Sequence, residues 1–371
     1  MANGRGGWPQ RGRNLDCDWD VMDRPANDRS VSSAATAPEQ RGGLRSRLRA
    51  IPLLLGAAAL VQPLARLLAR YDWRADILTH LQEAALGMTL IAIAGLVWRH
   101  RRIAAVLTAL AIFQVVPLLR YSGSNPVLPE PASSARLRIL MANVLAHNSD
   151  HERLAELIRR ERPDVVGLVE VTHAWLHDLA DVRAEYPYRY EAPGGTQGLA
   201  LWFRERPLAD AEVEPLVAGG WPVLHAIIEF GGLPRHLWLV HPASPLRHQR
   251  RRPGNSELVA LGERVQQTGG SRVVIGDLNS TDGSPHFSDF LDTSGLRDTR
   301  LGFGRQPSWP VWSPYRITID HAFLSPDLAV ASRRLGPDIG SDHRPLILDV
   351  ALAAGAVSAT KAATQASQSS P

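Results

Sequence analysis

Three long apolar stretches near the N-terminus constrain this chain more than any other feature of its sequence. They cover residues 51–69, 77–98 and 103–119. Each approaches the roughly 20 residues that an α-helix needs to cross the hydrocarbon layer of a membrane. Each also contains polar residues, so helices of a soluble bundle remain the alternative interpretation.

Arginines cluster at the ends of these stretches. Four of them lie between residues 41 and 49, and Arg99, Arg101 and Arg102 separate the second stretch from the third. Cytoplasmic loops of membrane proteins carry an excess of Lys and Arg. We therefore expect a cytoplasmic N-terminus, three crossings and a C-terminal part outside the cytoplasm.

The formal charge of +4 is unevenly distributed along the chain. Residues 1–135 carry 16 basic and 10 acidic side chains, whereas residues 136–352 carry 24 basic and 27 acidic side chains. The basic front segment would face anionic lipid headgroups. The C-terminal part lacks the broad basic field of a non-specific nucleic-acid binder.

Composition and texture divide the chain into five parts. The single cysteine, Cys17, excludes a disulfide or a cysteine metal site within one chain, so a bound metal needs oxygen and nitrogen ligands. After a Pro/Ser-rich segment, short apolar runs alternate with polar helical stretches, which indicates an α/β domain. We expect strands at 137–142, 165–169, 199–203, 224–230, 237–240, 273–275, 317–324 and 346–350, and helices at 150–161, 172–183 and 255–268. We expect a disordered cytoplasmic tail at 1–49, three transmembrane helices at 50–120, a linker at 121–135, the α/β domain at 136–352 and a disordered tail at 353–371.

Polar residues recur where the apolar strands of the α/β domain begin or end. They are Asn143, Glu170, His241, Asp277, Asn279, Asp320, Asp342 and His343. Residues at strand ends on a rigid scaffold are where catalytic groups usually lie. Carboxylate and amide oxygens are hard ligands that suit Mg²⁺ or Mn²⁺, and a histidine held by a carboxylate can move a proton.

Six motifs in this order resemble the endonuclease/exonuclease/phosphatase (DNase I-like) superfamily, namely MANVL, LVEV, GDLNS, PSWP, ITIDHAFLS and GSDHRPLI. The resemblance implies a four-layer α/β/β/α sandwich that hydrolyses phosphoesters with Mg²⁺ or Mn²⁺. The three apolar stretches also resemble a membrane-anchored bacterial branch with teicoplanin-resistance relatives. That branch implies a multi-pass protein of the bacterial inner membrane that acts on a lipid-linked (polyprenyl) pyrophosphate outside the cytoplasm.

The resemblance also implies a role for each residue that matches a motif. It implies metal binding by Glu170, Asn143 and Asp342. It implies catalysis by Asp277, which aligns the attacking water, by Asn279 and His241, which contact the phosphate, and by His343, which Asp320 orients. Leu145 departs from the pattern, because many nucleases of the family have a polar residue there, and this argues against a second metal.

Three further features are open to two interpretations each. Arg247, Arg250 and Arg251 would either bind a phosphate or form a solvated loop. Trp309 fits packing better than catalysis. His321 should face away from Asp320, because neighbouring residues of a strand point to opposite faces.

Two other functions compete with a lipid phosphatase. A nuclease acting on extracytoplasmic DNA or RNA would use the same residues, and an inactive membrane-bound recognition module would keep the fold without the metal. The sequence gives no reason to expect an obligate protein partner. The partners we expect are the phosphate-containing substrate and the lipid bilayer.

Overall fold

The computed structural model describes residues 41–122, 131–132, 135–244 and 256–354. The disorder that we expected at 1–40 and 355–371 lies outside these residues. The chain separates into two compact units, residues 1–46 and 47–371, and the fold below belongs to the second unit. Helix α1 (Arg41–Ala59) begins inside the tail that we expected to be disordered, because arginine and leucine are good helix formers.

Two six-stranded sheets form the centre of the C-terminal part. The first sheet has the order β11-β12-β1-β2-β4-β3 and the second has the order β5-β6-β7-β8-β10-β9. The strands of the first sheet are β1 (Leu137–Asn143), β2 (Val165–Val169), β3 (Tyr188–Ala192), β4 (Leu199–Phe203), β11 (Leu328–Leu335) and β12 (Leu346–Leu352). Those of the second are β5 (Ala209–Pro215), β6 (Pro222–Phe230), β7 (Leu233–Val240), β8 (Ser271–Asp277), β9 (Arg297–Asp298) and β10 (Asp320–Leu324).

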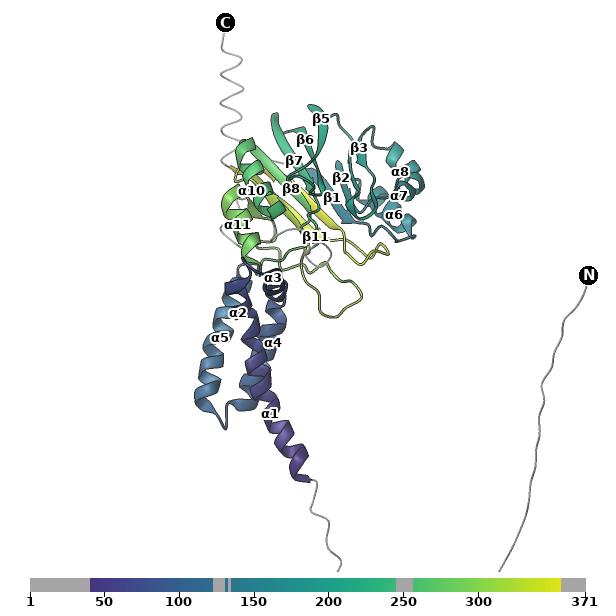
Figure 1. Cartoon of the computed structure of the whole chain (residues 1–371). Helices are drawn as coiled ribbons and strands as arrows, with labels where there is room; N and C mark the ends of the chain where they lie inside the picture. The colour runs from purple at the N-terminus through teal and green to yellow at the C-terminus, as the bar shows by residue number, and fades with distance from the viewer. Residues whose placement is uncertain (1–40, 123–130, 133–134, 245–255, 355–371) are drawn as a thin grey trace, which may run out of the picture. The chain divides into compact units, whose positions relative to one another are not determined.

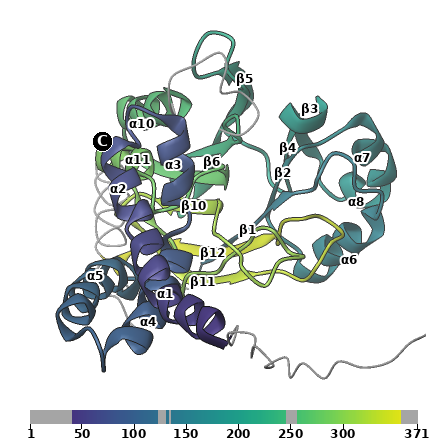
Figure 2. The ribbon, with the colours of Figure 1, turned by 60° about the horizontal axis from the view of Figure 1, so that its bottom comes forward.

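Helices cover the outer face of each sheet, which gives the expected four layers (Figure 1 and Figure 2). Helices α6 (His151–Glu161), α7 (His173–Asp178) and α8 (Ala180–Ala184) pack on the first sheet, and α10 (Ser256–Thr268) and α11 (Pro285–Ser294) pack on the second. The inner faces of both sheets share one apolar core, in which strands contribute alternate Val, Leu and Ile side chains. The fold is therefore a mixed α/β sandwich of the DNase I type.

The strand directions explain why the polar residues lie on one rim. Each sheet has one parallel pair at its centre, β1 with β2 and β7 with β8, so the carboxyl ends of these four strands share an edge. Strand β10 is antiparallel to β8, and β12 is antiparallel to β1, so both begin at that same edge. Residues that follow β1, β2, β7 and β8 therefore meet residues that precede or begin β10 and β12.

Gly276 lets β8 approach β7 closely just before this rim. Its φ is +155°, and a Cβ built there would lie 1.9 Å from the carbonyl oxygen of Val240. Any side chain would force the two strands apart. The glycine of the GDLN motif therefore sets the backbone from which Asp277 extends.

Between residues 41 and 122, five helices precede the sandwich. They are α1, α2 (Val61–Leu68), α3 (Trp73–Thr79), α4 (Gln82–Leu96) and α5 (Arg101–Leu119). By length and composition, 49–68 and 101–119 can each cross a membrane, and α3 with α4 counts as a third span if the bent pair is one crossing. The chain bends by 63° between these two helices. We call the segment from Ile77 to Leu81 at this bend the elbow.

The helices expose apolar side chains and bury polar ones. Leu67, Ile91 and Phe113 are 72%, 60% and 65% exposed. Inside, Thr89 donates a hydrogen bond to the Gln114 Oε1 atom at 3.0 Å. Polar groups that bond to each other inside a bundle whose outer surface is apolar are typical of helices in lipid.

Polar contacts join these helices to the sandwich. Ser284 Oγ donates to Asp76 Oδ1 at 2.6 Å, and both residues are buried. Arg300 Nη2 donates to the hydroxyl oxygen of Tyr121 at 3.0 Å, and Tyr121 is fully buried. Within our expected linker at 121–135, Tyr121 is thus part of the packed structure, and Ala132 donates its N–H to Leu352 at the end of β12.

Candidate active site

Three side chains from three strand ends meet at the centre of the rim. The Asn143 Nδ2 atom at the end of β1 lies 3.1 Å from Glu170 Oε1 and 3.0 Å from Asp277 Oδ2. Glu170 follows β2, and Asp277 ends β8. The amide therefore bridges two carboxylates that come from different sheets, and it presents its nitrogen to them.

A second group of side chains enters from the antiparallel strands. His343 Nδ1 lies 2.8 Å from Asp320 Oδ2, and His343 Nε2 lies 3.7 Å from Asp277 Oδ2. Burial alone would lower the pKa of His343, but the two carboxylates outweigh it and raise the pKa to about 10. His343 is therefore an imidazolium at neutral pH, with Asp320 fixing its ring.

Asp277 lies between the two groups. Burial raises the pKa of its carboxyl group to about 7, although the charge of His343 opposes the shift. The His241 ring follows β7, and its Nε2 lies 3.6 Å from Asp277 Oδ2. Trp221 packs edge-on against that ring at 5.0 Å between centroids. A carboxyl group with a pKa near neutrality can take up a proton at physiological pH.

Three residues of the rim have left-handed backbone conformations. Leu145 has φ +58°, Glu170 has φ +63° and Asn279 has φ +50°. This region is unfavourable for a residue other than glycine, asparagine or aspartate, and such strain clusters at functional sites. Asn279 donates its backbone N–H to Asp277 Oδ1 at 2.8 Å and its Nδ2 to the carbonyl of Pro242 at 3.0 Å. The GDLN turn is thus fixed on both sides.

Asp342 contacts both an aromatic and a basic side chain, and its Oδ1 atom lies 3.9 Å from His343 Nε2. Trp309 Nε1 donates to Asp342 Oδ2 at 2.9 Å. The other oxygen of Asp342, and likewise Oδ1 of Asp320, is buried without a hydrogen-bond partner among the described residues. Buried carboxylate oxygens without a donor are costly unless a cation is present.

The donor set fits a divalent cation. Ligand atoms of Asp277, Asp320 and His343 lie within 4.8 Å of one another. His343 is protonated, and its Nδ1 atom bonds to Asp320, so it has no free nitrogen for a metal. We therefore describe the three residues as a His343–Asp320 ion pair beside the Asp277 carboxylate, and not as the metal ligands. Glu170 and Asp342 leave oxygen donors for a hard cation beside that ion pair.

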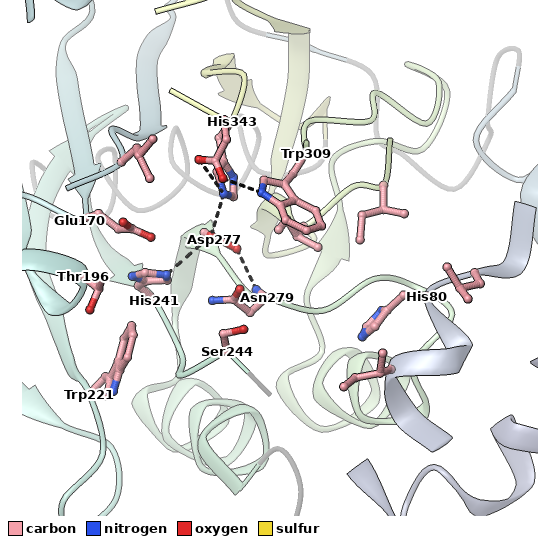
Figure 3. Close-up of a pocket in the computed structure, with 16 residues that line it drawn as sticks. His80, Glu170, Thr196, Trp221, His241, Ser244, Asp277, Asn279, Trp309 and His343 are labelled. Carbon is pink, nitrogen blue, oxygen red and sulfur yellow. Dashed lines mark hydrogen bonds and ion pairs between the residues drawn. The ribbon is translucent and has the colours of Figure 1, made fainter. Parts of the chain in front are cut away.

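These side chains line a cavity of about 310 Å³ (Figure 3). Figure 3 shows Glu170, Thr196, His241 and Trp221 on one side of it, Asp277, Asn279 and Trp309 in the middle, and His80 on the other side. The remaining lining includes Ile77, Leu81, Leu145, Ser244, Ile317 and Ile319. The elbow between α3 and α4 therefore forms one wall of the cavity.

The structure brings together all eight residues that we expected at the metal and catalytic positions. Arg247, Arg250 and Arg251 lie outside the described residues. His321 is buried on the other side of β10, where its Nε2 atom lies 2.9 Å from the carbonyl oxygen of Ser280. Burial lowers its pKa to about 4.

Several residues of the cavity were not predicted from the sequence. Trp309 was expected to be a packing residue, but it both lines the cavity and holds Asp342. Trp221 and the elbow residues belong to no motif, and only the fold brings them to the rim. The PSWP motif was a usable signal for Trp309, whereas the elbow residues carried none.

Comparison with known proteins gives the following relations. The model of the Endonuclease/Exonuclease/phosphatase family matches residues 142–343. A search of curated proteins found no match. An endonuclease/exonuclease/phosphatase from Bacteroides vulgatus is 18% identical, with a TM-score of 0.49 over 59% of this chain and 100% of that one. D. rerio TDP2 complexed with a single-strand DNA product is 18% identical (TM-score 0.48, 58% and 99% covered), and the human Nocturnin catalytic domain is 19% identical (TM-score 0.48, 60% and 96% covered).

Proposed function

Because the chain belongs to the Endonuclease/Exonuclease/phosphatase family and is a divalent-metal-dependent phosphoester hydrolase, we propose that it hydrolyses a lipid-linked phosphate or pyrophosphate at a membrane surface. The observation that carries this proposal is the cavity itself. One side of it holds the carboxylates and histidines of a phosphoester hydrolase, and the other side is formed by a candidate membrane span.

The charges of the site support a single-step attack by water on phosphorus. Asp277, with its raised pKa, orients the water and accepts its proton as the new P–O bond forms. Asn279 and His241 bind the non-bridging oxygens. The His343 imidazolium stabilises the negative charge that develops as the bond to the leaving oxygen breaks. With a pyrophosphate the products are inorganic phosphate and the lipid monophosphate.

Glu170 is the residue that we propose as the main metal ligand. Asp342 and Asn143 complete the set, and the Asn143 amide has to turn its oxygen toward the cation to take part. Oxygen ligands of this kind favour Mg²⁺, with Mn²⁺ as a substitute. When bound, the cation neutralises charge on a phosphoryl oxygen.

The helices support a membrane location. Their exposed apolar side chains and internal polar contacts match a lipid environment better than water. The arginines at 41–49 and 99–102 favour a cytoplasmic N-terminus and, with three crossings, an extracytoplasmic catalytic domain in a bacterial inner membrane.

The decisive experiment uses the full chain in lipid nanodiscs with Mg²⁺ and measures phosphate release from a polyprenyl pyrophosphate beside nicking of supercoiled plasmid. We expect metal-dependent phosphate release that EDTA abolishes, and at least a hundredfold loss in the Glu170→Gln variant, because that change removes the charge of the main ligand. Nicking without phosphate release would replace the proposal with a nuclease. Activity that survives both EDTA and Glu170→Gln would contradict the proposed chemistry.

A further inference from the structure

We propose that the elbow between α3 and α4 is a substrate-binding subsite, which receives the junction between the phosphate group and the apolar chain of an amphiphilic substrate. This inference rests on the function proposed above and names the part of the substrate that the helices contact. The subsite consists of Ile77, His80 and Leu81 on the elbow together with Ile317 and Ile319, which line the same cavity.

The apolar residues give the subsite its selectivity. Ile77 and Leu81 line the cavity together with Ile317 and Ile319, and Leu81 is 41% exposed. A cavity that only had to hold a phosphate or a sugar would gain nothing from four aliphatic side chains. An apolar chain bound there loses contact with water, which favours binding in proportion to the area that is buried.

The position of the elbow determines where such a chain would come from. Ile77 belongs to α3, Leu81 precedes α4, and these two helices form a candidate membrane span bent by 63°. The elbow thus connects the cavity with a segment whose outer surface suits lipid. A lipid phosphate can place its headgroup at Asp277 and leave its chain along the elbow without exposing the chain to water.

His80 supplies a polar group at the same place. Thr281 contacts His80 Nδ1 twice, through its hydroxyl at 2.8 Å and its backbone N–H at 3.2 Å. The backbone N–H can only donate, so Nδ1 is assigned as the acceptor and the proton of the neutral ring as lying on Nε2. Nε2 is buried and has no hydrogen-bond partner among the described residues. A buried N–H that lines the site and lacks an acceptor calls for a ligand oxygen. The oxygen that links phosphate and chain would supply it.

The apolar part of the subsite is tested by chain length. Full-length protein in nanodiscs is given isoprenyl pyrophosphates of five, fifteen and fifty-five carbons, and kcat/KM is measured for each. We expect the value to rise with chain length. In the Ile77→Ala/Leu81→Ala double variant, we expect the ratio of long-chain to five-carbon kcat/KM to fall at least about tenfold, since each buried methylene contributes severalfold to discrimination.

A matched control changes two apolar residues of the same pair of helices that do not line the cavity. Leu90 and Ile91 lie on α4, are 53% and 60% exposed and do not line the cavity. The Leu90→Ala/Ile91→Ala variant should keep the wild-type ratio. Equal turnover of all chain lengths, or an unchanged ratio in the elbow variant, overturns the subsite while leaving the proposed hydrolysis intact. If none of the three substrates releases phosphate, the result counts instead against the proposed function.

The polar part is tested with two substitutions of His80. Asparagine places a polar atom where Nδ1 contacts Thr281 but cannot reach the position of Nε2, whereas glutamine can reach it. We expect His80→Asn to raise KM about tenfold and His80→Gln to restore most of the loss. Equal KM values for wild type and His80→Asn would exclude His80 from the subsite.

Discussion

Asp320 fixes the ring of His343 through one hydrogen bond, because its Oδ2 atom lies 2.8 Å from His343 Nδ1. The pKa of His343 is raised to about 10 by Asp320 and Asp277 against the effect of burial. A raised pKa means that the charged form is stabilised. The protonated His343 therefore contributes to the free energy of unfolding. This contribution is complete below about pH 6.5 and is lost as the pH rises through 10.

The Asp320→Asn substitution should therefore move the alkaline limb of the pH–rate profile to lower pH by at least about one unit, because it removes the largest charge that raises the pKa of His343. We expect kcat at neutral pH to fall about a hundredfold. The profile is measured between pH 5 and 10 with saturating metal. Asp181→Asn, an exposed aspartate on α8, is the matched control. If the alkaline limb does not shift, Asp320 does not raise the pKa of His343.

Trp309 should control metal affinity through Asp342. Trp309→Phe retains a ring but removes the Nε1–H that holds Asp342 at 2.9 Å. Outer contacts of this kind typically contribute 10–100-fold to metal affinity, so we expect the half-activating Mg²⁺ concentration to rise about tenfold. A Mg²⁺ titration of activity checks this.

The control for this experiment is Trp312→Phe, since Trp312 is 79% exposed and lies three residues further along the chain. It should titrate like the wild type. A normal titration of Trp309→Phe would show that Asp342 does not depend on its tryptophan.

The sequence was enough to predict which polar residues lie together at the rim wherever those residues end apolar strands. Asn143, Glu170 and Asp277 were identifiable because each follows a run of buried aliphatic residues. His80 and Trp221 were not, because their approach depends on long-range packing that no local pattern encodes. The left-handed backbone of Glu170 was equally hidden, since the residue type disfavours it.

At the scale of elements, continuous apolar runs were enough to predict β2 and β4, whose residues are all buried and whose bounds agree with the expected runs at 165–169 and 199–203. Strand β5 was missed because it is a polar edge strand in which every residue is exposed or half-buried. Helix α11 was missed because its sequence, PHFSDFLDTS, contains weak helix formers. Its N-terminus was nevertheless marked, since Ser284 caps it and Pro285 begins it.

Tyr121 should stabilise the sandwich although it lies just after α5, before the first strand of the sandwich begins. It is fully buried, and its hydroxyl accepts a hydrogen bond from Arg300, which also pairs with Asp298. Tyr121→Ala leaves a cavity beside a buried guanidinium, and we expect a loss of about 3 kcal/mol in unfolding free energy. Urea denaturation of the full chain in detergent, followed by tryptophan fluorescence, measures it.

Tyr71→Ala is the matched control for this prediction, because Tyr71 is 86% exposed. The midpoint of its urea unfolding should equal that of the wild type. An equally small effect at Tyr121 would mean that the stability of the sandwich does not depend on this contact.

At the scale of the whole molecule, the apolar surface of the helices predicts how the protein fractionates. The full chain should stay with membranes through 1 M salt and alkaline carbonate, because these treatments remove proteins held by charge and leave those held by apolar burial. A chain lacking residues 1–120 should be released. Sedimentation followed by immunoblotting separates the outcomes, and release of the full chain by carbonate would contradict a spanning anchor.

The elbow has a kinetic consequence as well. Under the proposed function, one wall of the cavity belongs to the membrane anchor, and the enzyme would then meet its lipid substrate by lateral diffusion in two dimensions. The relevant concentration is then the mole fraction of substrate in the bilayer, and diluting it with inert phospholipid should slow turnover even when the amount of substrate per millilitre stays constant. A vesicle that contains substrate but no enzyme would remain untouched beside one that contains both.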